Sequence, residues 1–254
     1  MSIAIVTGAS SGFGREFVRR FDAQGFDAIW VIARRKERLE ALAAECKTPV
    51  RVLPLDLTDA AALESFRQLL ETEKPDVKVL VNNSGFGYFR PFAEEDLSLT
   101  LNMMALNNTA LVTLTHHVLP YMAAGSEVYN IASSSAFQPV PYIGAYAATK
   151  SFVLSFSRSL NVELKPRGIR VMAVCPHWTK TEFFDTAVRE DNVIVHYNFF
   201  NDTEKVVDDA LKNMKRGKDV SFSGLKIRLQ VLATKLLPHR AVMRIWCAQQ
   251  KKPY

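Results

Sequence analysis

The chain has 254 residues, of which 48% are hydrophobic, so it is long enough to bury the core of one large α/β domain. It contains no apolar run of about 18 residues and no charged-then-apolar leader, so we expect neither a membrane span nor a signal peptide. The three cysteines lack a CxxC spacing, which favours reduced, buried thiols and a cytoplasmic protein.

The formal charge of +6 is concentrated at the carboxyl-terminal end of the chain. Residues 225–254 contain seven Lys or Arg and no Asp or Glu, whereas residues 1–224 contain 25 basic and 26 acidic residues. The basicity therefore belongs to the tail, and it does not indicate that the body of the protein binds nucleic acid.

A glycine-rich turn follows the first predicted strand, Ile3–Thr7, and precedes a helix with apolar residues on one face. Gly8 allows a tight turn, and Gly12 and Gly14 let the backbone approach a pyrophosphate near the helix amino terminus, where free N–H groups favour anions. The spacing is TGxxxGxG in place of the commoner GxGxxG. We therefore predict a dinucleotide site, to which the same turn contributes Ser10, Ser11 and Phe13.

The second predicted strand, Ala28–Ala33, is followed by two arginines. A cofactor with a free ribose 2′-hydroxyl calls for an acidic side chain at this point, whereas a guanidinium binds a 2′-phosphate. Arg34 and Arg35 therefore predict NADP(H) rather than NAD(H), with Arg34 as the leading contact. The alternative is that both arginines are solvated charges at the start of a helix.

Small polar residues follow the next two predicted strands, Val50–Leu55 and Lys78–Val81. Open parallel sheets bind ligands at the carboxyl ends of their strands. We therefore expect contacts with the adenine edge and the rest of the cofactor from Asp56, Leu57, Asn83 and Gly85. The loop that follows, residues 86–92, is expected to form one wall of the substrate pocket.

A long helix is predicted over Leu97–Ala123, and an asparagine lies in its middle. An amide inside an apolar helix costs free energy unless it is hydrogen-bonded, which makes Asn107 a candidate site residue. The neighbouring Asn108 is interpreted as an exposed polar residue. His116 and His117 diverge on a helix and have no carboxylate partners, so we predict no metal site.

The main chemical signal is a tyrosine followed four residues later by a lysine, in the sequence YAATK. On a helix, Tyr146 and Lys150 lie one turn apart on the same face. A nearby ammonium favours the phenolate, so we expect it to lower the pKa of the phenol from about 10 toward the working range. Ser133 follows the predicted strand Val128–Ala132, which would bring its hydroxyl beside the phenol. The three groups suit proton transfer to or from a carbonyl or alcohol oxygen.

A sixth predicted strand, Ile169–Cys175, leads into a polar turn. We expect Pro176, Thr179 and Thr181 in this turn to contact the cofactor, with Thr181 at the nicotinamide carboxamide or a phosphate. Residues 182–200 have weak periodicity and many bulky side chains, which is typical of a mobile lid over an apolar substrate. The candidate substrate contacts are Phe86, Tyr142, His177, Phe183, Phe184 and Tyr197.

A helix capped by Asp202 and a short strand, Val220–Phe222, precede a basic helical extension, residues 225–254. Four leucines of this extension follow helical spacing and form an apolar stripe opposed by basic residues: Leu225, Leu229, Leu232 and Leu236. Pro238 breaks this pattern before a second helix. We expect this extension to cap the active site or to contact another subunit; the alternative is contact with an anionic membrane surface.

From residue 3 to residue 224, the chain resembles the short-chain dehydrogenase/reductase family in the order and spacing of TGASSGFG, Asp56, NNSG, Asn107, Ser133, YAATK and the turn 176–181. The resemblance implies a Rossmann-type, doubly wound sheet of seven parallel strands, one catalytic domain in residues 1–224, and a homodimer or homotetramer. It also implies a catalytic tetrad, carried here onto Asn107, Ser133, Tyr146 and Lys150, in which the lysine also holds the nicotinamide ribose and the asparagine supports the lysine through water. In departure from the family pattern, His177 stands where a glycine normally follows the proline, and Ser11 stands where many NADP-preferring relatives carry a basic residue.

The resulting prediction is an NADP(H)-dependent enzyme that interconverts a ketone and a secondary alcohol, with Tyr146 as general acid or base. Aromatic loops and an apolar tail favour a hydrophobic substrate such as a hydroxysteroid, a bile acid or a lipid-like ketone. One alternative is a reductase of small hydroxy acids or 3-ketoacyl thioesters. The other is a redox sensor that binds NADP(H) without turnover.

Overall fold

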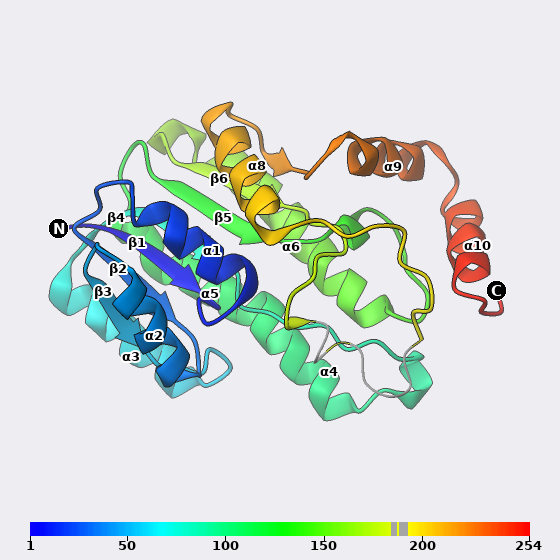
Figure 1. The fold of residues 1–254 in the computed structure, drawn as a ribbon, viewed down its shortest axis with the longest axis horizontal. Coiled ribbons are helices and arrows are strands. Elements are labelled where there is room, and N and C mark those ends of the chain that lie inside the picture. The colour runs from blue at the N-terminus through cyan, green and yellow to red at the C-terminus, as the bar shows by residue number, and fades with distance from the viewer. Residues whose placement is uncertain (184–186, 188–192) are drawn as a thin grey trace.

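Seven parallel strands form one sheet in the computed structural model, which describes residues 1–183, 187 and 193–254 (Figure 1). The strand order is β3-β2-β1-β4-β5-β6-β7, so the direction of winding reverses between β1 and β4. The strands are β1 Ser2–Thr7, β2 Ala28–Ile32, β3 Val50–Leu53, β4 Asp76–Asn82, β5 Glu127–Ile131, β6 Arg170–Val174 and β7 Val220–Ser221. The predicted doubly wound, Rossmann-type sheet is confirmed, and ligands bind at such a reversal, outside the carboxyl ends of the strands.

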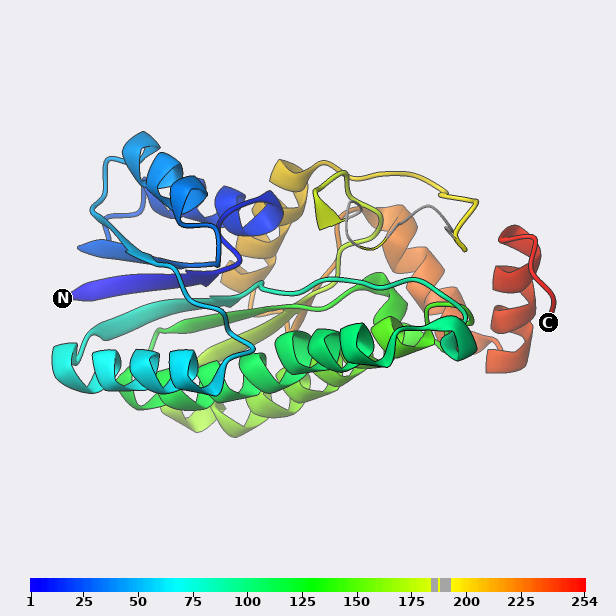
Figure 2. The ribbon, with the colours of Figure 1, turned by 90° about the horizontal axis from the view of Figure 1, so that it is seen from below.

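Helices cover both faces of this sheet (Figure 1 and Figure 2). Successive strand residues point to opposite faces, so each face has its own apolar core. The face that carries Val6 and Val31 is covered by α1 (Gly12–Phe21), α2 (Lys36–Glu45) and α8 (Thr203–Lys215). The face that carries Ile5 and Trp30 is covered by α3 (Ala60–Glu73), α5 (Leu111–Val118) and α6 (Gly144–Glu163).

The long helix predicted over residues 97–123 is present without a break as far as Val118, but it is not α-helical throughout. It comprises α4 (Leu97–Met104), a π-helical segment (Ala105–Ala110) and α5, and it gives way to a short 3-10 turn at Leu119. A π-helical segment is frequent at functional sites, and here it contains Asn107. The prediction that Asn108 is exposed is wrong, because this side chain is half-buried and donates to the Thr149 carbonyl oxygen at 2.9 Å.

Asp59 and Asp202 both precede helices, but of these two only Asp59 caps with its side chain. The Asp59 carboxylate accepts from the Ala61 N–H at 2.9 Å at the start of α3. Asp202 occupies the N-cap position of α8, but its side chain accepts no hydrogen bond from the first turn of that helix. Asp202 is therefore at the predicted N-cap position, but its side chain does not cap the helix.

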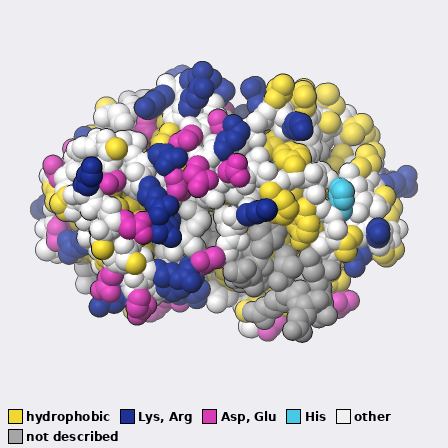
Figure 3. Space-filling model, viewed as in Figure 1, with side chains coloured by type: hydrophobic (Ala, Val, Ile, Leu, Met, Phe, Trp, Pro, Cys, Tyr) yellow, Lys and Arg dark blue, Asp and Glu magenta, His cyan; other side chains and the backbone are white. Residues whose placement is uncertain are grey.

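The extension folds into two helices, α9 (Leu225–Leu236) and α10 (His239–Gln249), separated at Pro238. The leucine stripe of α9 faces solvent, and the exposed fractions of Leu225, Leu229, Leu232 and Leu236 are 67%, 56%, 52% and 75%. Ile227 and Val231, which are 0% and 5% exposed, form the inward face instead. The leucine stripe is therefore not the packed face of α9, and hydrophobic side chains gather on the surface over α9 (Figure 3). Contact of the stripe with another subunit or with a membrane surface stays a prediction.

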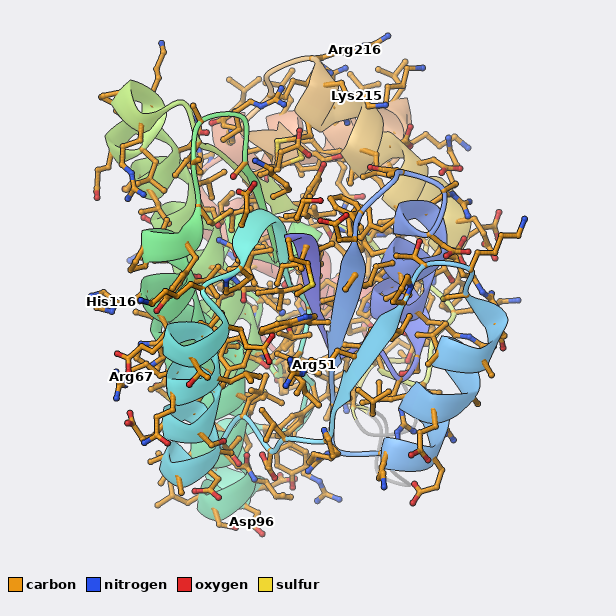
Figure 4. All side chains as sticks on the ribbon, turned by 90° about the vertical axis from the view of Figure 1, so that its left-hand side faces the viewer. Arg51, Arg67, Asp96, His116, Lys215 and Arg216 are labelled. Carbon is orange, nitrogen blue, oxygen red and sulfur yellow. The ribbon has the colours of Figure 1, made fainter. Side chains whose placement is uncertain are left out.

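Arg67 on α3 and His116 on α5 lie at the outer edge of their helix layer (Figure 4). No cluster of three metal-ligating side chains occurs within the described ranges, and Cys46, Cys175 and Cys247 are free. Of the helices that the structure describes, none is long and apolar enough to cross a bilayer.

Candidate active site

The glycine turn after β1 forms a cradle that side chains would fill. A Cβ added to Gly14 would lie 2.3 Å from the Gly8 carbonyl oxygen, and a Cβ on Gly8 would lie 2.6 Å from Asn83 Nδ2. Gly8 and Gly12 also have positive φ angles of 64° and 53°, which favour glycine. The backbone therefore lies open beside the amino terminus of α1, where the N–H groups and the helix dipole suit a pyrophosphate.

Hydrogen bonds from β4 hold this cradle at the reversal point of the sheet. Asn83 Nδ2 donates to the carbonyl oxygens of Thr7 at 3.0 Å and Gly8 at 3.1 Å. The Thr7 hydroxyl oxygen accepts from the backbone N–H groups of Asn83 and Ser84, each at 2.9 Å. The predicted groove residue Asn83 therefore shapes the glycine turn directly, which the strand pattern alone did not indicate.

The two arginines after β2 occupy different environments. Arg35 is fixed over the glycine turn, because its guanidinium donates to the Ser10 hydroxyl at 2.9 Å and to Glu182 at 2.7 Å. The Arg34 side chain is 71% exposed, and its nearest acidic partner is Asp56 at 3.9 Å. The guanidinium of Arg34 is thus the one that remains accessible to an incoming anion at this end of the groove.

Ser133, Tyr146 and Lys150 converge beneath the carboxyl ends of β5 and β6. Ser133 follows β5, and Tyr146 and Lys150 lie on α6, with exposed fractions of 8% and 6%. The Lys150 ammonium lies 5.9 Å from the centroid of the Tyr146 ring and donates to the Ile131 carbonyl oxygen at 2.8 Å. The predicted trio is therefore assembled at one site, in a largely dry environment.

Burial dominates the titration of this trio. It raises the pKa of the Tyr146 phenol well above its usual value, and a hydrogen bond with Ser133 lowers that pKa by a smaller amount. Burial also lowers the pKa of Lys150 to about 8. The expectation that Lys150 brings the phenol pKa toward neutrality is not met in this structure, because desolvation of the phenolate is the largest effect on that pKa.

The side chain of Asn107 lies behind the cavity wall, beside Lys150, and holds two neighbouring segments in place. Its side chain, 1% exposed, accepts from the Phe86 N–H at 3.1 Å and donates to the Phe86 carbonyl oxygen at 3.0 Å. It also donates to the Thr149 hydroxyl at 3.1 Å, on the residue next to Lys150. A Cβ on Gly85 would lie 2.7 Å from Asn107 Oδ1 and 3.6 Å from Lys150 Nζ, so this glycine fills the gap between the two side chains.

One cavity of about 830 Å³ joins the dinucleotide groove to this trio. It is lined by all the predicted cofactor contacts except Gly14, which packs under the glycine turn: Gly8, Ser10, Ser11, Gly12, Phe13, Arg34, Arg35, Asp56, Leu57, Asn83, Gly85, Tyr146, Lys150, Pro176, Thr179 and Thr181. Thr181 lies against the glycine turn, where a Cβ on Gly12 would be 3.4 Å from its methyl group. Asn107 does not line the cavity and acts from behind its wall.

The substrate end of the cavity has aromatic walls. Tyr146 lies between Phe89, with ring centroids 5.4 Å apart, and Phe183, with ring centroids 5.5 Å apart. Three of the predicted substrate contacts line the cavity: Phe86, His177 and Phe183. Phe184 lies outside the described residues.

Two of the predicted substrate contacts, Tyr142 and Tyr197, do not line this cavity. Tyr142 has a positive φ of 70° that turns it toward the chain end, where its hydroxyl donates to the Pro253 carbonyl oxygen at 2.8 Å. Tyr197 packs edge-on against Trp178, with ring centroids 5.0 Å apart, and does not line the cavity. Trp178 takes the place at the wall that was expected of Tyr197.

The inward faces of α9 and α10 complete the substrate end with residues that the sequence did not single out, among them Val231, Trp246 and Gln250. The amide of Gln250, 1% exposed, accepts from the N–H groups of Val195 and His196 at 2.9 Å and 3.0 Å. The described end of the predicted lid is therefore fixed to α10. The mobility of that lid stays a prediction, and residues 184–186 and 188–192 lie outside the described part of the chain.

The family profile described as short chain dehydrogenase matches residues 2–192. The chain belongs to the short-chain dehydrogenase/reductase family. It is 38% identical over 187 residues to sulfoacetaldehyde reductase 2 of Chromohalobacter salexigens, with 71% of this chain and 74% of that protein covered. As a member of this family, the protein is an oxidoreductase that acts on CH–OH groups.

Two solved short-chain dehydrogenases match nearly the whole chain. A short-chain dehydrogenase from Sphingobium yanoikuyae in complex with NADPH is 32% identical, with 96% of both chains covered and a TM-score of 0.81. A bulky-bulky ketone specific alcohol dehydrogenase from Comamonas testosteroni is 29% identical, with 96% of this chain and 94% of that chain covered and a TM-score of 0.76. The coverage shows that the likeness extends beyond the sheet into the terminal helices.

Proposed function

We propose that the protein is an NADP(H)-dependent reductase of bulky, uncharged ketones, with Tyr146 as the general acid. The observation that carries this proposal is the position of Tyr146: it lines the same cavity as Ser133 and Lys150, and its ring lies between Phe89 and Phe183 in the part that continues from the glycine cradle. A proton donor between apolar walls suits a ketone whose oxygen meets the phenol and whose carbon skeleton meets the aromatic rings.

The bound nicotinamide supplies the hydride that reduces the carbonyl carbon. Tyr146 donates its proton to the carbonyl oxygen, and the Ser133 hydroxyl hydrogen-bonds that oxygen as negative charge develops. A raised phenol pKa keeps Tyr146 protonated at neutral pH, which is the form that reduction requires. The reverse reaction requires the phenolate and is disfavoured by the same burial.

Lys150 and Asn107 hold the cofactor side of this arrangement. Lys150 would bind the nicotinamide ribose. Its ammonium also stabilises negative charge at the reacting oxygen, and this interaction is strong because the site is buried. Asn107 fixes Phe86 and Thr149, so it keeps the wall beside Lys150 in place. A water relay between the asparagine and the lysine stays a prediction.

The adenine end of the groove favours NADP(H) over NAD(H). An exposed Arg34 can pair with a ribose 2′-phosphate, whereas the only acidic cavity-lining side chains in the described parts of the chain are Asp56 and Glu182. Glu182 is bonded to Arg35 and Arg38, so it is not free to receive a ribose hydroxyl. The Sphingobium relative in complex with NADPH supports the same choice.

The charge of the cavity favours an uncharged ketone over a hydroxy acid. Among the described residues that line it, the lysine and arginine residues are Arg34 and Arg35, at the cofactor end, and Lys150, which is buried one helical turn from Tyr146. A substrate carboxylate or sulfonate requires a partner cation in a site closed to water. The name of the Comamonas relative, specific for bulky-bulky ketones, fits these walls better than that of the sulfoacetaldehyde reductase.

NADPH consumption by the purified protein against a ketone panel tests this proposal. The panel pairs bulky uncharged ketones, including steroid ketones, with 3-keto acids and sulfoacetaldehyde. We expect kcat/KM to be higher for the uncharged ketones by at least about tenfold, equivalent to about 1.4 kcal/mol in transition-state binding. A preference for the acids would contradict the proposal and favour a reductase of small hydroxy acids. Binding of NADPH without turnover of any ketone would favour a redox sensor that binds NADP(H).

A further inference from the structure

His177 is fixed at the wall of the cavity by one of its two ring nitrogens. It directly follows Pro176 beyond β6, and its Nδ1 lies 2.9 Å from the Ser134 hydroxyl oxygen, on the residue next to Ser133. The ring also packs against Phe199, with centroids 4.7 Å apart. These contacts determine the orientation of the imidazole and leave Nε2 as the nitrogen that is free to bind something else.

Two buried polar atoms of the cavity wall have no hydrogen-bond partner. Seven buried side-chain nitrogen or oxygen atoms lack a partner among the described residues, and two of the seven belong to residues that line the cavity: His177 Nε2 and Gln138 Oε1. A polar atom that is taken out of water without a partner destabilises the protein, so native structures keep few of them. Two such atoms in one binding cavity indicate a ligand that supplies the missing bonds.

Both residues are attached to the same short element beside Ser133. A 3-10 helix spans Ser134–Phe137; His177 bonds to its first residue, and Gln138 directly follows its last. A 3-10 helix rises about 2 Å per residue, so the backbone of Gln138 lies within about 10 Å of Ser134. Both side chains therefore belong to the same part of the cavity lining as Ser133, where a bulky substrate would lie.

We infer that His177 Nε2 and the Gln138 side-chain amide bind a hydroxyl group of the substrate, at a distance from the ketone that is reduced. This inference rests on the proposed function and narrows its substrate class to ketones that carry a second, uncharged oxygen function. A hydroxyl group accepts a hydrogen bond and donates another, so it can satisfy a donor at His177 and an acceptor at Gln138. A carboxylate can only accept and would leave the Gln138 oxygen without a bond.

The protonation state of His177 agrees with an uncharged ligand. Burial lowers the pKa of His177 to about 4, so the imidazole is neutral at pH 7. When the Ser134 hydroxyl donates to Nδ1, the ring proton is on Nε2 and points away from Ser134. A neutral imidazole and a neutral amide discriminate by hydrogen-bond geometry rather than by charge.

The test compares two ketones of the same skeleton, one with a distal hydroxyl and one with hydrogen in its place, in the wild type and in three variants. His177→Asn keeps a polar atom near the position of Nδ1 and removes Nε2, whereas His177→Gln keeps an amide nitrogen near the position of Nε2. Gln138→Leu removes the acceptor. Gln249→Leu is the matched control, because Gln249 also lines the cavity but is exposed.

We expect the wild type to prefer the hydroxylated ketone by about 10- to 100-fold in kcat/KM, mainly through KM, because a site built to hydrogen-bond an oxygen rejects the analogue that lacks it. His177→Asn and Gln138→Leu each reduce that preference by about tenfold, because kcat/KM falls further for the hydroxylated ketone than for the plain one. His177→Gln restores part of the preference, and Gln249→Leu retains it in full. Thermal unfolding and NADPH binding of each variant show whether it is folded.

The ratio of the two ketones separates this inference from the proposed function. If the wild type reduces the plain ketone as well as the hydroxylated one, or if both His177→Asn and Gln138→Leu retain the preference, the hydroxyl site is wrong while the ketone reductase remains. If neither ketone of any skeleton is reduced although NADPH binds, the proposed function fails. A purely structural role of His177 would lower both rates together and leave the ratio unchanged.

Discussion

Lys150 donates its side-chain hydrogen bond to the Ile131 carbonyl oxygen at 2.8 Å, while its ammonium lies 5.9 Å from the centroid of the Tyr146 ring. The two residues are one helical turn apart on α6, as their spacing requires. The hydrogen bond therefore holds the lysine side chain against β5. Burial of the phenol, and not the charge of the lysine, has the largest effect on the phenol pKa. This arrangement keeps the phenol protonated and suits reduction.

The first prediction concerns the pH dependence of ketone reduction. Burial lowers the pKa of Lys150 to about 8, so the ammonium is present below that pH and lost above it. We expect kcat/KM for the ketone to be constant from pH 6 to about pH 7.5 and to fall as the pH rises through about 8, since this profile reports the free enzyme. Lys150→Arg keeps its charge at these pH values and should move the fall to higher pH. An unchanged fall in that variant would assign it to another group.

The second prediction concerns the choice of cofactor. Arg34→Ala removes the exposed guanidinium beside Asp56 and should raise KM for NADPH by about 10- to 100-fold, because a hydrogen-bonded charge pair contributes about 1.5–3 kcal/mol. KM for NADH should change little. Arg38→Ala is the control, since Arg38 is bonded to Glu182 and does not line the cavity. A wild type that prefers NADH would contradict the assignment of NADP(H).

Hydrophobic patterning and motif spacing predict the sheet and the catalytic trio well, because each strand and the turn that carries its site residues are adjacent in the sequence. Each strand of a parallel sheet is an apolar run followed by a ligand-binding turn, so Gly8, Asn83, Ser133 and Pro176 could all be assigned to the same edge before the fold was known. The π-helical segment around Asn107 has no signal in the apolar periodicity, and the side chain of Asn107 is bonded there to Phe86 and Thr149, which are distant in sequence.

The tail shows where patterning alone fails. Both faces of α9 carry apolar residues, and periodicity groups the leucines on one face without saying which face meets the protein. The inward face is set by contacts distant in sequence, as are the places of Gln138, Trp246 and Gln250 at the cavity wall. The positive φ of Tyr142, which turns it out of the cavity, has no signal in the sequence.

The third prediction tests the orientation of α9 through stability. Ile227 is 0% exposed, so Ile227→Ala should lower the free energy of unfolding by about 2–4 kcal/mol through lost burial and a residual cavity. Leu229 is 56% exposed, so Leu229→Ala should change it by less than about 1 kcal/mol. Urea unfolding of the two variants provides the comparison. The reverse order would mean that the leucine stripe, and not the face of Ile227, packs on the protein.

The fourth prediction uses the buried imidazole of His177. Its pKa is lowered from 6.5 to about 4 by burial, so the unfolded chain binds a proton there at pH values at which the folded chain does not. The stability that this group contributes is complete above about pH 6.5 and is lost as the pH falls toward 4, up to about 3 kcal/mol. Urea midpoints at pH 7 and pH 4.5 should therefore fall further apart in the wild type than in His177→Asn. Equal differences in the two proteins would place the imidazole in a solvated position.

The most direct test of the whole account is the rate of hydride transfer in Tyr146→Phe, measured in a single turnover with NADPH and a bulky ketone. We expect this rate to fall by about 10²- to 10⁴-fold, because the proton donor is removed, while the dissociation constant of NADPH stays nearly the same. Retention of wild-type activity in a folded Tyr146→Phe variant would contradict the role of this phenol and, with it, the proposed reduction.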